Sequence, residues 1–125
     1  MTQQLKVSRI TAVMLGVKDV EQSIAFYRDK LGLPVKMQEP QLALLDCGQV
    51  TLGLSPGHVR IAPQIAGATE VTFHVDNLRS AHKALASSGI TFLSEPRQAT
   101  ATEWVAHFKD PDGHLLSIFG PEGKV

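Results

Sequence analysis

The sequence has one cysteine, no net charge and no long apolar run, and each of these properties argues against a class of protein. It contains a single cysteine, Cys47, so no disulfide can form within the chain, which favours the reducing cytoplasm as its location. Acidic and basic residues number 12 each, so the chain has no basic footprint for nucleic acid or a membrane surface. No apolar run reaches the length of a signal peptide or a membrane span.

What is present is enough for one compact core. Hydrophobic residues make up 43% of the sequence, and its 125 residues fit a single domain over residues 1–125. For Cys47, burial as a small apolar side chain is a simpler explanation than a catalytic thiol.

The chain repeats one pattern of strand and helix. Residues 15–20 read LGVKDV and residues 73–78 read FHVDNL, 58 positions further on. In both copies an apolar strand leads to a helix-capping side chain, Asp19 or Asn77. One repeat of this size predicts two copies of a supersecondary unit rather than a solenoid, which would need more repeats.

Each copy is expected to have the order βαβββ. In the first, Gly32 ends a helix that carries an apolar stripe, and Gly89 does the same in the second. The strands expected in the first copy are 11–17, 35–38, 42–47 and 50–55, and those in the second are 70–75, 90–94, 104–108 and 114–119. The predicted boundaries are about 8–55 for module one, 56–68 for a linker and about 69–121 for module two.

A turn and the strand after it complete the second copy. Asp110-Pro111-Asp112-Gly113 has the residue preferences of a type I turn at every position. The strand that follows has two usable faces because its side chains alternate. One face needs a helix to cover it, and the other is free to line a cavity.

The DPDG turn followed by an alternating strand, after a βαβ segment, resembles the vicinal oxygen chelate superfamily, which includes glyoxalase I, bleomycin resistance proteins and extradiol dioxygenases. The resemblance implies an α+β fold in which two βαβββ modules form a cup-shaped mixed sheet with the helices outside. It covers residues from about 10 to 121. It also implies a homodimer and a small molecule held in the cup. Whether the modules pair within a chain or across the dimer stays open.

Metal-dependent members of that family have four ligand positions, which the resemblance places at Ala12, Gly53, Glu70 and Ser117. Of these, only the glutamate is a good ligand for a divalent ion, whereas catalytic zinc needs about three protein ligands. Glu70 and His74 are about 13 Å apart along one strand, and His107 could approach either one but not both. We therefore expect no metal and no cofactor.

Strand alternation places a mixed set of small, apolar and polar residues in the cup, as in a small-molecule pocket. The expected ligand-binding residues are Met14, Thr51, Gly53, Glu70, Thr72, His74, Val105, His107, Leu115, Ser117 and Phe119. Ala12, Gly16, Ser55 and Glu103 share these faces.

The polar members also have simpler explanations. Glu70 could be a hydrated strand end, His74 a hydrogen-bonded packing residue, and Glu103 a solvated side chain. In fosfomycin-resistance relatives the position of His107 often contacts substrate, so this histidine is favoured for function. By strand parity, Trp104 should face the helix or a subunit contact. The remaining histidines, His58, His82 and His114, are expected in loops or at the surface.

Three functions remain open. The first is a metal-free binding protein that holds an apolar or aromatic compound in the cup. The second is an enzyme, either a metal-dependent lyase, isomerase or dioxygenase with unusual ligands, or a metal-free catalyst with Glu70 and His107 as an acid–base pair. The third is an accessory protein whose cup has no ligand. The missing metal ligands favour the first function over a metal enzyme.

Overall fold

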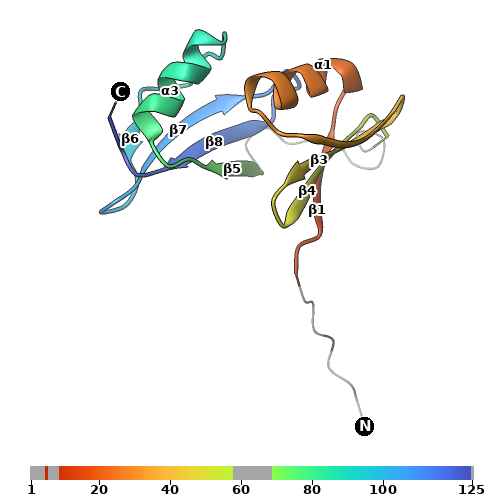
Figure 1. The fold of residues 1–125 in the computed structure, drawn as a ribbon, viewed down its shortest axis with the longest axis horizontal. Coiled ribbons are helices and arrows are strands. Elements are labelled where there is room, and N and C mark those ends of the chain that lie inside the picture. The colour runs from red at the N-terminus through yellow and green to blue at the C-terminus, as the bar shows by residue number, and fades with distance from the viewer. Residues whose placement is uncertain (1–4, 6–8, 58–68, 125) are drawn as a thin grey trace.

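The structure, a computed structural model, describes Leu5, residues 9–57 and residues 69–124, which form two similar modules (Figure 1). The elements of the first are β1 (Ala12–Gly16), α1 (Val20–Ile24), its continuation η1 (Ala25–Lys30), β2 (Val35–Glu39), β3 (Leu42–Cys47) and β4 (Val50–Ser55). Those of the second are β5 (Glu70–His74), α3 (Leu78–Ser87), β6 (Arg97–Gln98), β7 (Trp104–Lys109) and β8 (Leu115–Gly120). Both modules have the predicted βαβββ order.

Each module contains one four-stranded mixed sheet, and the two sheets have equivalent strand orders, β1-β4-β3-β2 and β5-β8-β7-β6. In both, the first and last strands of the module pair in parallel, and the other pairs are antiparallel. The predicted α+β fold class of two βαβββ modules is confirmed.

The helices begin and end at the predicted residues. Asp19 Oδ1 accepts hydrogen bonds of 2.9 and 3.2 Å from backbone N–H groups of the first turn of α1, and Asn77 Oδ1 accepts one of 3.0 Å at the start of α3. Gly32 and Gly89 follow the two helices with φ of +80° and +98°, a conformation that side chains with a Cβ rarely adopt.

The helix of the first module is one residue longer than α3. Thirteen steps separate the cap Asp19 from Gly32, whereas twelve separate Asn77 from Gly89. The stretch η1 absorbs the extra residue as a π-helix, in which the N–H of Leu31 donates to the carbonyl of the residue five positions earlier at 3.3 Å. Such one-residue insertions displace the side chains that follow along the helix surface.

The core lies between each sheet and its helix, and Figure 1 shows α1 and α3 on the same side of the molecule. Trp104 packs against this core, with the Arg79 guanidinium 4.9 Å from its ring centre, so the prediction that it faces the helix is confirmed. The largest fully buried side chains are those of Tyr27, Phe108, Leu45, Leu54, Leu78 and Leu116; burying each large apolar group stabilises the fold by about 1.5–3 kcal/mol.

One predicted strand is wrong. Residues 90–94 form only a single bridge, between Phe92 and Phe108, and the short strand of this region is β6. Ile90 is buried, but Pro96, just before β6, has no N–H group to continue a ladder.

Most of the predicted linker, and His58, lie outside the described residues, so the module boundaries stay a prediction. In the described part of the chain, no helix combines the length and the hydrophobicity needed to cross a membrane.

Candidate functional site

The predicted ligand-binding residues lie on the sheet faces that the helices do not cover. In the second sheet the strand register aligns the pairs Glu70–Leu115, Thr72–Ser117 and His74–Phe119, and places Val105 and His107 beside Phe119 and Ser117. In the first sheet it aligns Ala12–Thr51, Met14–Gly53 and Gly16–Ser55. The residues thus share faces as strand alternation indicates, and their contact with a ligand stays a prediction.

Glu70 and His107 meet on the open face of the second sheet. His107 Nε2 lies 3.1 Å from Glu70 Oε2, and the two side chains are 19% and 34% exposed, respectively. At this distance the Nε2–H group of His107 can donate a hydrogen bond to the Glu70 carboxylate, and a protonated imidazole would add electrostatic attraction. The pair can therefore anchor a polar group of a ligand or exchange a proton with it.

Two other polar residues have local partners instead. His74 Nε2 lies 2.9 Å from Asp76 Oδ1, and its side chain is 66% exposed, so the explanation of His74 as a packing residue is wrong. Glu103 Oε1 accepts a hydrogen bond of 3.2 Å from Thr100 Oγ1. His107 therefore pairs with Glu70 and not with His74.

The residues at the four family ligand positions do not fit a metal centre. Ser117 is fully buried, and its hydroxyl donates to Thr72 Oγ1 at 2.9 Å. The side chain of Met14 lies over Gly53, where a Cβ atom would meet its sulfur and terminal methyl group. Alanine and glycine supply no donor atom, and a neutral hydroxyl is a poor partner for a divalent ion. Within the described ranges, no three His, Cys, Asp or Glu side chains form a metal-binding group.

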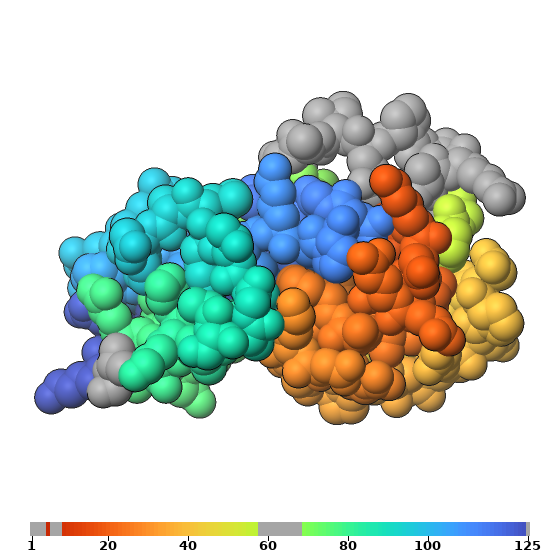
Figure 2. Space-filling model, turned by 90° about the horizontal axis from the view of Figure 1, so that it is seen from above, coloured from red at the N-terminus to blue at the C-terminus, as the bar shows by residue number. Residues whose placement is uncertain are grey.

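A buried polar cluster joins the two modules at the DPDG turn, and we call it the sealed junction: Tyr27, Asp110 and His114. Asp110 Oδ2 accepts a hydrogen bond of 2.7 Å from the Tyr27 hydroxyl and lies 2.6 Å from His114 Nδ1. The Asp112 carboxylate accepts from the backbone N–H of Lys18 at 2.9 Å. Figure 2 shows this part of the second module against the first.

The sealed junction shifts the pKa of each of its members. The hydrogen bond to Asp110 raises the pKa of His114 against the opposing effect of burial. Burial alone would raise the pKa of Asp110, but hydrogen bonds from His114 and Tyr27 outweigh it and hold that pKa below its ordinary value. Burial, together with the Asp110 charge, raises the pKa of Tyr27. His114 lies in the loop between β7 and β8, one of the two places expected for it, but its side chain is only 12% exposed.

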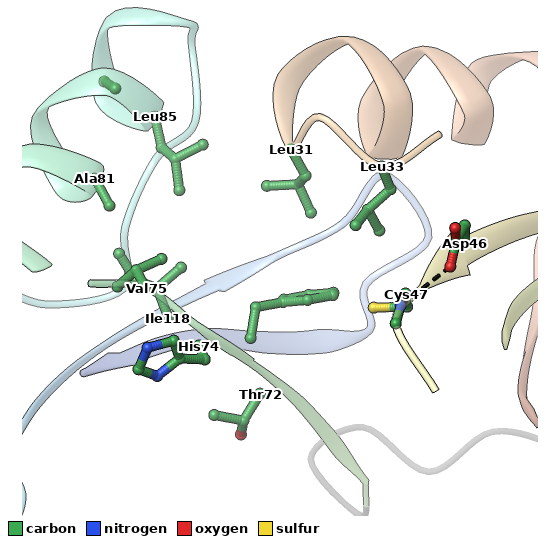
Figure 3. Close-up of a pocket in the computed structure, with 13 residues that line it drawn as sticks. Leu31, Leu33, Asp46, Cys47, Thr72, His74, Val75, Ala81, Leu85 and Ile118 are labelled. Atoms are coloured by element: carbon green, nitrogen blue, oxygen red, sulfur yellow. Dashed lines mark hydrogen bonds between the residues drawn. The ribbon is translucent and has the colours of Figure 1, made fainter. Parts of the chain in front are cut away.

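A groove of about 560 Å³ separates the modules on the other side of this contact (Figure 3). Leu31 and Leu33 face Leu85 and Ala81 across it in the close-up. The complete lining is Leu31, Leu33, Asp46, Cys47, Gly48, Thr72, Phe73, His74, Val75, Ala81, Ala84, Leu85 and Ile118. Only Thr72 and His74 belong to the predicted ligand-binding set, so sequence reasoning missed this groove.

Cys47 lines the groove as a partly buried free thiol. Burial, and to a smaller extent the neighbouring Asp46 carboxylate, raise its pKa. A thiol in this setting stays protonated at neutral pH, as expected of a residue that is not a nucleophile.

Comparison with known proteins gives one family. Residues 9–118 match the family described as Glyoxalase/Bleomycin resistance protein/Dioxygenase superfamily. The glutathione transferase FosA of Serratia marcescens is 29% identical over 108 residues, covering 83% of this chain and 74% of FosA.

Solved structures of both binding proteins and enzymes share the fold. TnmS3, an antibiotic binding protein from Streptomyces sp. CB03234, is 19% identical with a TM-score of 0.77, covering 94% of this chain and 99% of TnmS3. A lactoylglutathione lyase from Agrobacterium tumefaciens is 18% identical with a TM-score of 0.75, covering 93% of this chain and 96% of the lyase. At these identities the likeness shows the fold alone, and the site must be argued from this chain's own residues.

Proposed function

The chain belongs to the Glyoxalase/Bleomycin resistance protein/Dioxygenase superfamily, and from that premise we propose that it binds a small apolar or aromatic molecule without a metal ion. The observation that carries the proposal is the Glu70–His107 pair at 3.1 Å. Ser117 shares its face of the second sheet, and Ala12 and Gly53 have the corresponding positions in the first sheet. A polar pair beside apolar residues such as Val105 and Phe119 supplies a polar anchor and apolar walls, the usual composition of a ligand pocket.

The proposed site is completed by a second copy of the chain. Glu70, Thr72 and His74 are exposed on β5, the edge strand of the second sheet. Edge strands and half-open faces of this kind are commonly covered by another element or subunit. We propose a cytoplasmic homodimer in which the first sheet of one subunit covers the second sheet of its partner.

Ligand titration tests the binding function. A compound found by screening is titrated into the wild type and into Glu70→Ala, His107→Ala, His58→Ala and His82→Ala by calorimetry. Loss of a hydrogen bond to a charged group costs about 1.5–3 kcal/mol, so Glu70→Ala and His107→Ala should each weaken binding about tenfold or more. The two control variants should bind like the wild type. Equal losses in controls and site variants would place the pocket elsewhere.

The same pair also supports a second function, metal-free acid–base catalysis. In that case His107 would transfer a proton to or from the bound compound while Glu70 orients and stabilises the imidazolium. Incubation of the ligand with wild-type protein, followed by mass spectrometry, separates the two functions. Binding without turnover favours sequestration, and product formation that His107→Ala abolishes favours catalysis.

Sedimentation velocity at several concentrations tests the dimer. We expect a species of twice the 13.5 kDa chain mass at micromolar concentration. A clean monomer throughout would contradict the shared site, but it would leave the titration result on Glu70 and His107 standing.

A further inference from the structure

The groove between the modules lies at the place that corresponds, in the other half of the repeat, to the sealed junction. The sealed junction forms where the β7–β8 hairpin of the second module meets the helix of the first. The groove is lined by residues 46–48 of the β3–β4 hairpin in the first module and by Ala81, Ala84 and Leu85 of α3 in the second. The repeated unit therefore brings a hairpin and a helix together twice, once closed and once open.

The strand registers show which hairpin residues correspond. Gly53 and Ser117 have equivalent positions in the last strands of the two modules. Cys47 lies three residues beyond the antiparallel partner of Gly53, and Asp110 lies three residues beyond the antiparallel partner of Ser117. The carboxylate that accepts hydrogen bonds in the sealed junction is therefore replaced by a thiol in the groove.

The other two members of the sealed junction have aliphatic counterparts. By the same strand register, His114 corresponds to Val50. The repeat offset matches Tyr27 with Leu85, or with Ala84 once the extra residue of η1 is counted. The groove therefore lacks the phenol, the carboxylate and the imidazole that fill the sealed junction.

Both segments that meet at the groove are also one residue shorter. Two residues separate the paired ends of the β3–β4 hairpin, whereas three separate those of the β7–β8 hairpin, and α3 lacks the extra residue of η1. In the sealed junction the fully buried Tyr27 side chain lies between the modules. At the groove a space of about 560 Å³ is left instead, a volume within the usual range of small-molecule pockets.

The polar side chains of the groove lining have partners within the protein. Thr72 Oγ1 accepts a hydrogen bond of 2.9 Å from Ser117, and His74 Nε2 lies 2.9 Å from Asp76 Oδ1. Asp46 Oδ1 accepts a backbone N–H of its own turn at 3.1 Å. The surface that is left for a ligand is mainly hydrocarbon, supplied by leucines of both modules that face each other across the groove (Figure 3).

We propose that this groove binds an uncharged aromatic hydrocarbon of the size of naphthalene. Its rings take the place between the modules that the Tyr27 ring has in the sealed junction, and burial of apolar surface supplies the affinity. A charged group on the molecule would lose its hydration in the groove without gaining a partner. The site is separate from the Glu70–His107 pair, neither of which lines the groove, so the two binding sites stand or fall independently.

The single cysteine allows a site-specific test. Because Cys47 lines the groove and is the only thiol in the chain, its rate of modification by N-ethylmaleimide reports on what enters there. The probes are naphthalene and 2-naphthoate, which share the fused rings but differ in the carboxylate. We expect naphthalene to slow the reaction saturably, and 2-naphthoate to need a concentration at least about tenfold higher for the same protection.

Variants assign the effect to the groove. Ala84 is exposed on α3 and lines the groove, so Ala84→Phe should occupy part of the space and weaken the protection by naphthalene about tenfold or more. Ala86→Phe is the matched control, since it makes the same change at an exposed position of α3 outside the lining, and it should behave like the wild type. His107→Ala should also leave the protection unchanged. The comparison of the two probes in the wild type decides the question should Ala84→Phe fail to fold.

Several results would overturn the proposal. Modification of Cys47 that naphthalene does not slow, or equal protection by the two probes, would exclude an apolar site in the groove. Equal losses in Ala84→Phe and Ala86→Phe would show that the effect does not come from the groove lining. A thiol that reacts only when the protein is diluted would mean that a second copy of the chain covers the groove. Loss of protection in His107→Ala would place naphthalene on the open face of the second sheet instead.

Discussion

The hydroxyl of Tyr27 donates to Asp110 Oδ2 at 2.7 Å, joining the helix of the first module to the hairpin of the second. Both side chains are fully buried, so water cannot replace either partner if the bond is broken. A buried acceptor left without its donor costs more than a surface hydrogen bond, because its desolvation is no longer compensated.

We expect Tyr27→Phe to lower the free energy of unfolding by about 1.5–3 kcal/mol, the range for a hydrogen bond to a charged group. The ring and its packing against Phe26, 5.1 Å away between centroids, are kept, so the loss reports the hydroxyl alone. Urea denaturation followed by circular dichroism measures it. The matched control is Ser94→Ala, which removes an exposed hydroxyl with a long bond of 3.5 Å to the Glu95 carbonyl and should change stability by less than about 0.5 kcal/mol.

The sealed junction also predicts how stability depends on pH. The pKa of His114 is raised in the folded protein by its hydrogen bond to Asp110. Its contribution is therefore complete below the ordinary histidine value of about 6.5 and is lost as pH rises through the folded value. The pKa of Asp110 is lowered, so its contribution is present above about 4 and is lost as pH falls through the folded value.

Urea denaturation at a series of pH values between about 5 and 9 tests the histidine part. The free energy of unfolding of the wild type should fall as the pH rises above about 6.5. In His114→Asn this fall should be absent. His74→Asn, which changes an exposed imidazole, should keep it. An unchanged pH profile in His114→Asn would show that another group titrates in this range.

Purified protein should carry no stoichiometric transition metal. The reason is chemical: Ala12 and Gly53 offer no donor atoms, and the hydroxyl of Ser117 is engaged with Thr72. Elemental analysis after dialysis, with and without added Ni²⁺, Zn²⁺, Mn²⁺ or Fe²⁺, measures the content. One tightly held ion per chain would contradict the metal-free binding function.

Gly120, the last residue of β8, should not tolerate a side chain. A Cβ atom there would meet the carbonyl oxygen of Val75, and because that atom belongs to the backbone, the strand itself must move. We expect Gly120→Ala to cost about 3 kcal/mol in thermal or urea unfolding. Gly32→Ala is the control: it faces open space at φ +80° and should cost only about 1 kcal/mol from backbone strain. Equal costs would mean that β5 can shift freely.

Local signals predicted most of the fold. Capping side chains at Asp19 and Asn77, and glycines at Gly32 and Gly89, act over a few residues, so they can be read without tertiary information. The alternation of side chains along a strand is also a local property, and it correctly predicted that Trp104 faces the helix. The strand predicted at residues 90–94 is wrong. The composition of this segment suits a strand, but a strand also needs a neighbouring strand that pairs with it along its whole length, and here only Phe92 is paired.

The site was predictable in part. Alternation along β5 and β7 was enough to put Glu70 and His107 on one face. The burial of His114 could not be predicted from the sequence. His114 packs beside Asp110, which bonds Tyr27, a residue 83 positions earlier in the chain. The groove could not be predicted either, because its lining combines residues of both modules that are far apart in the sequence.

The length of chain between the partners of the sealed junction has a consequence for synthesis. Tyr27 and Asp110 are 83 positions apart, and Lys18 and Asp112 are 94 apart. During synthesis on the ribosome, Tyr27 cannot form its hydrogen bond until Asp110, near the end of the chain, has been made. Contacts this distant in sequence form late and slowly. A nascent chain released before residue 110 would therefore leave Tyr27 without its acceptor, and chaperones would be expected to bind the uncovered surface around it.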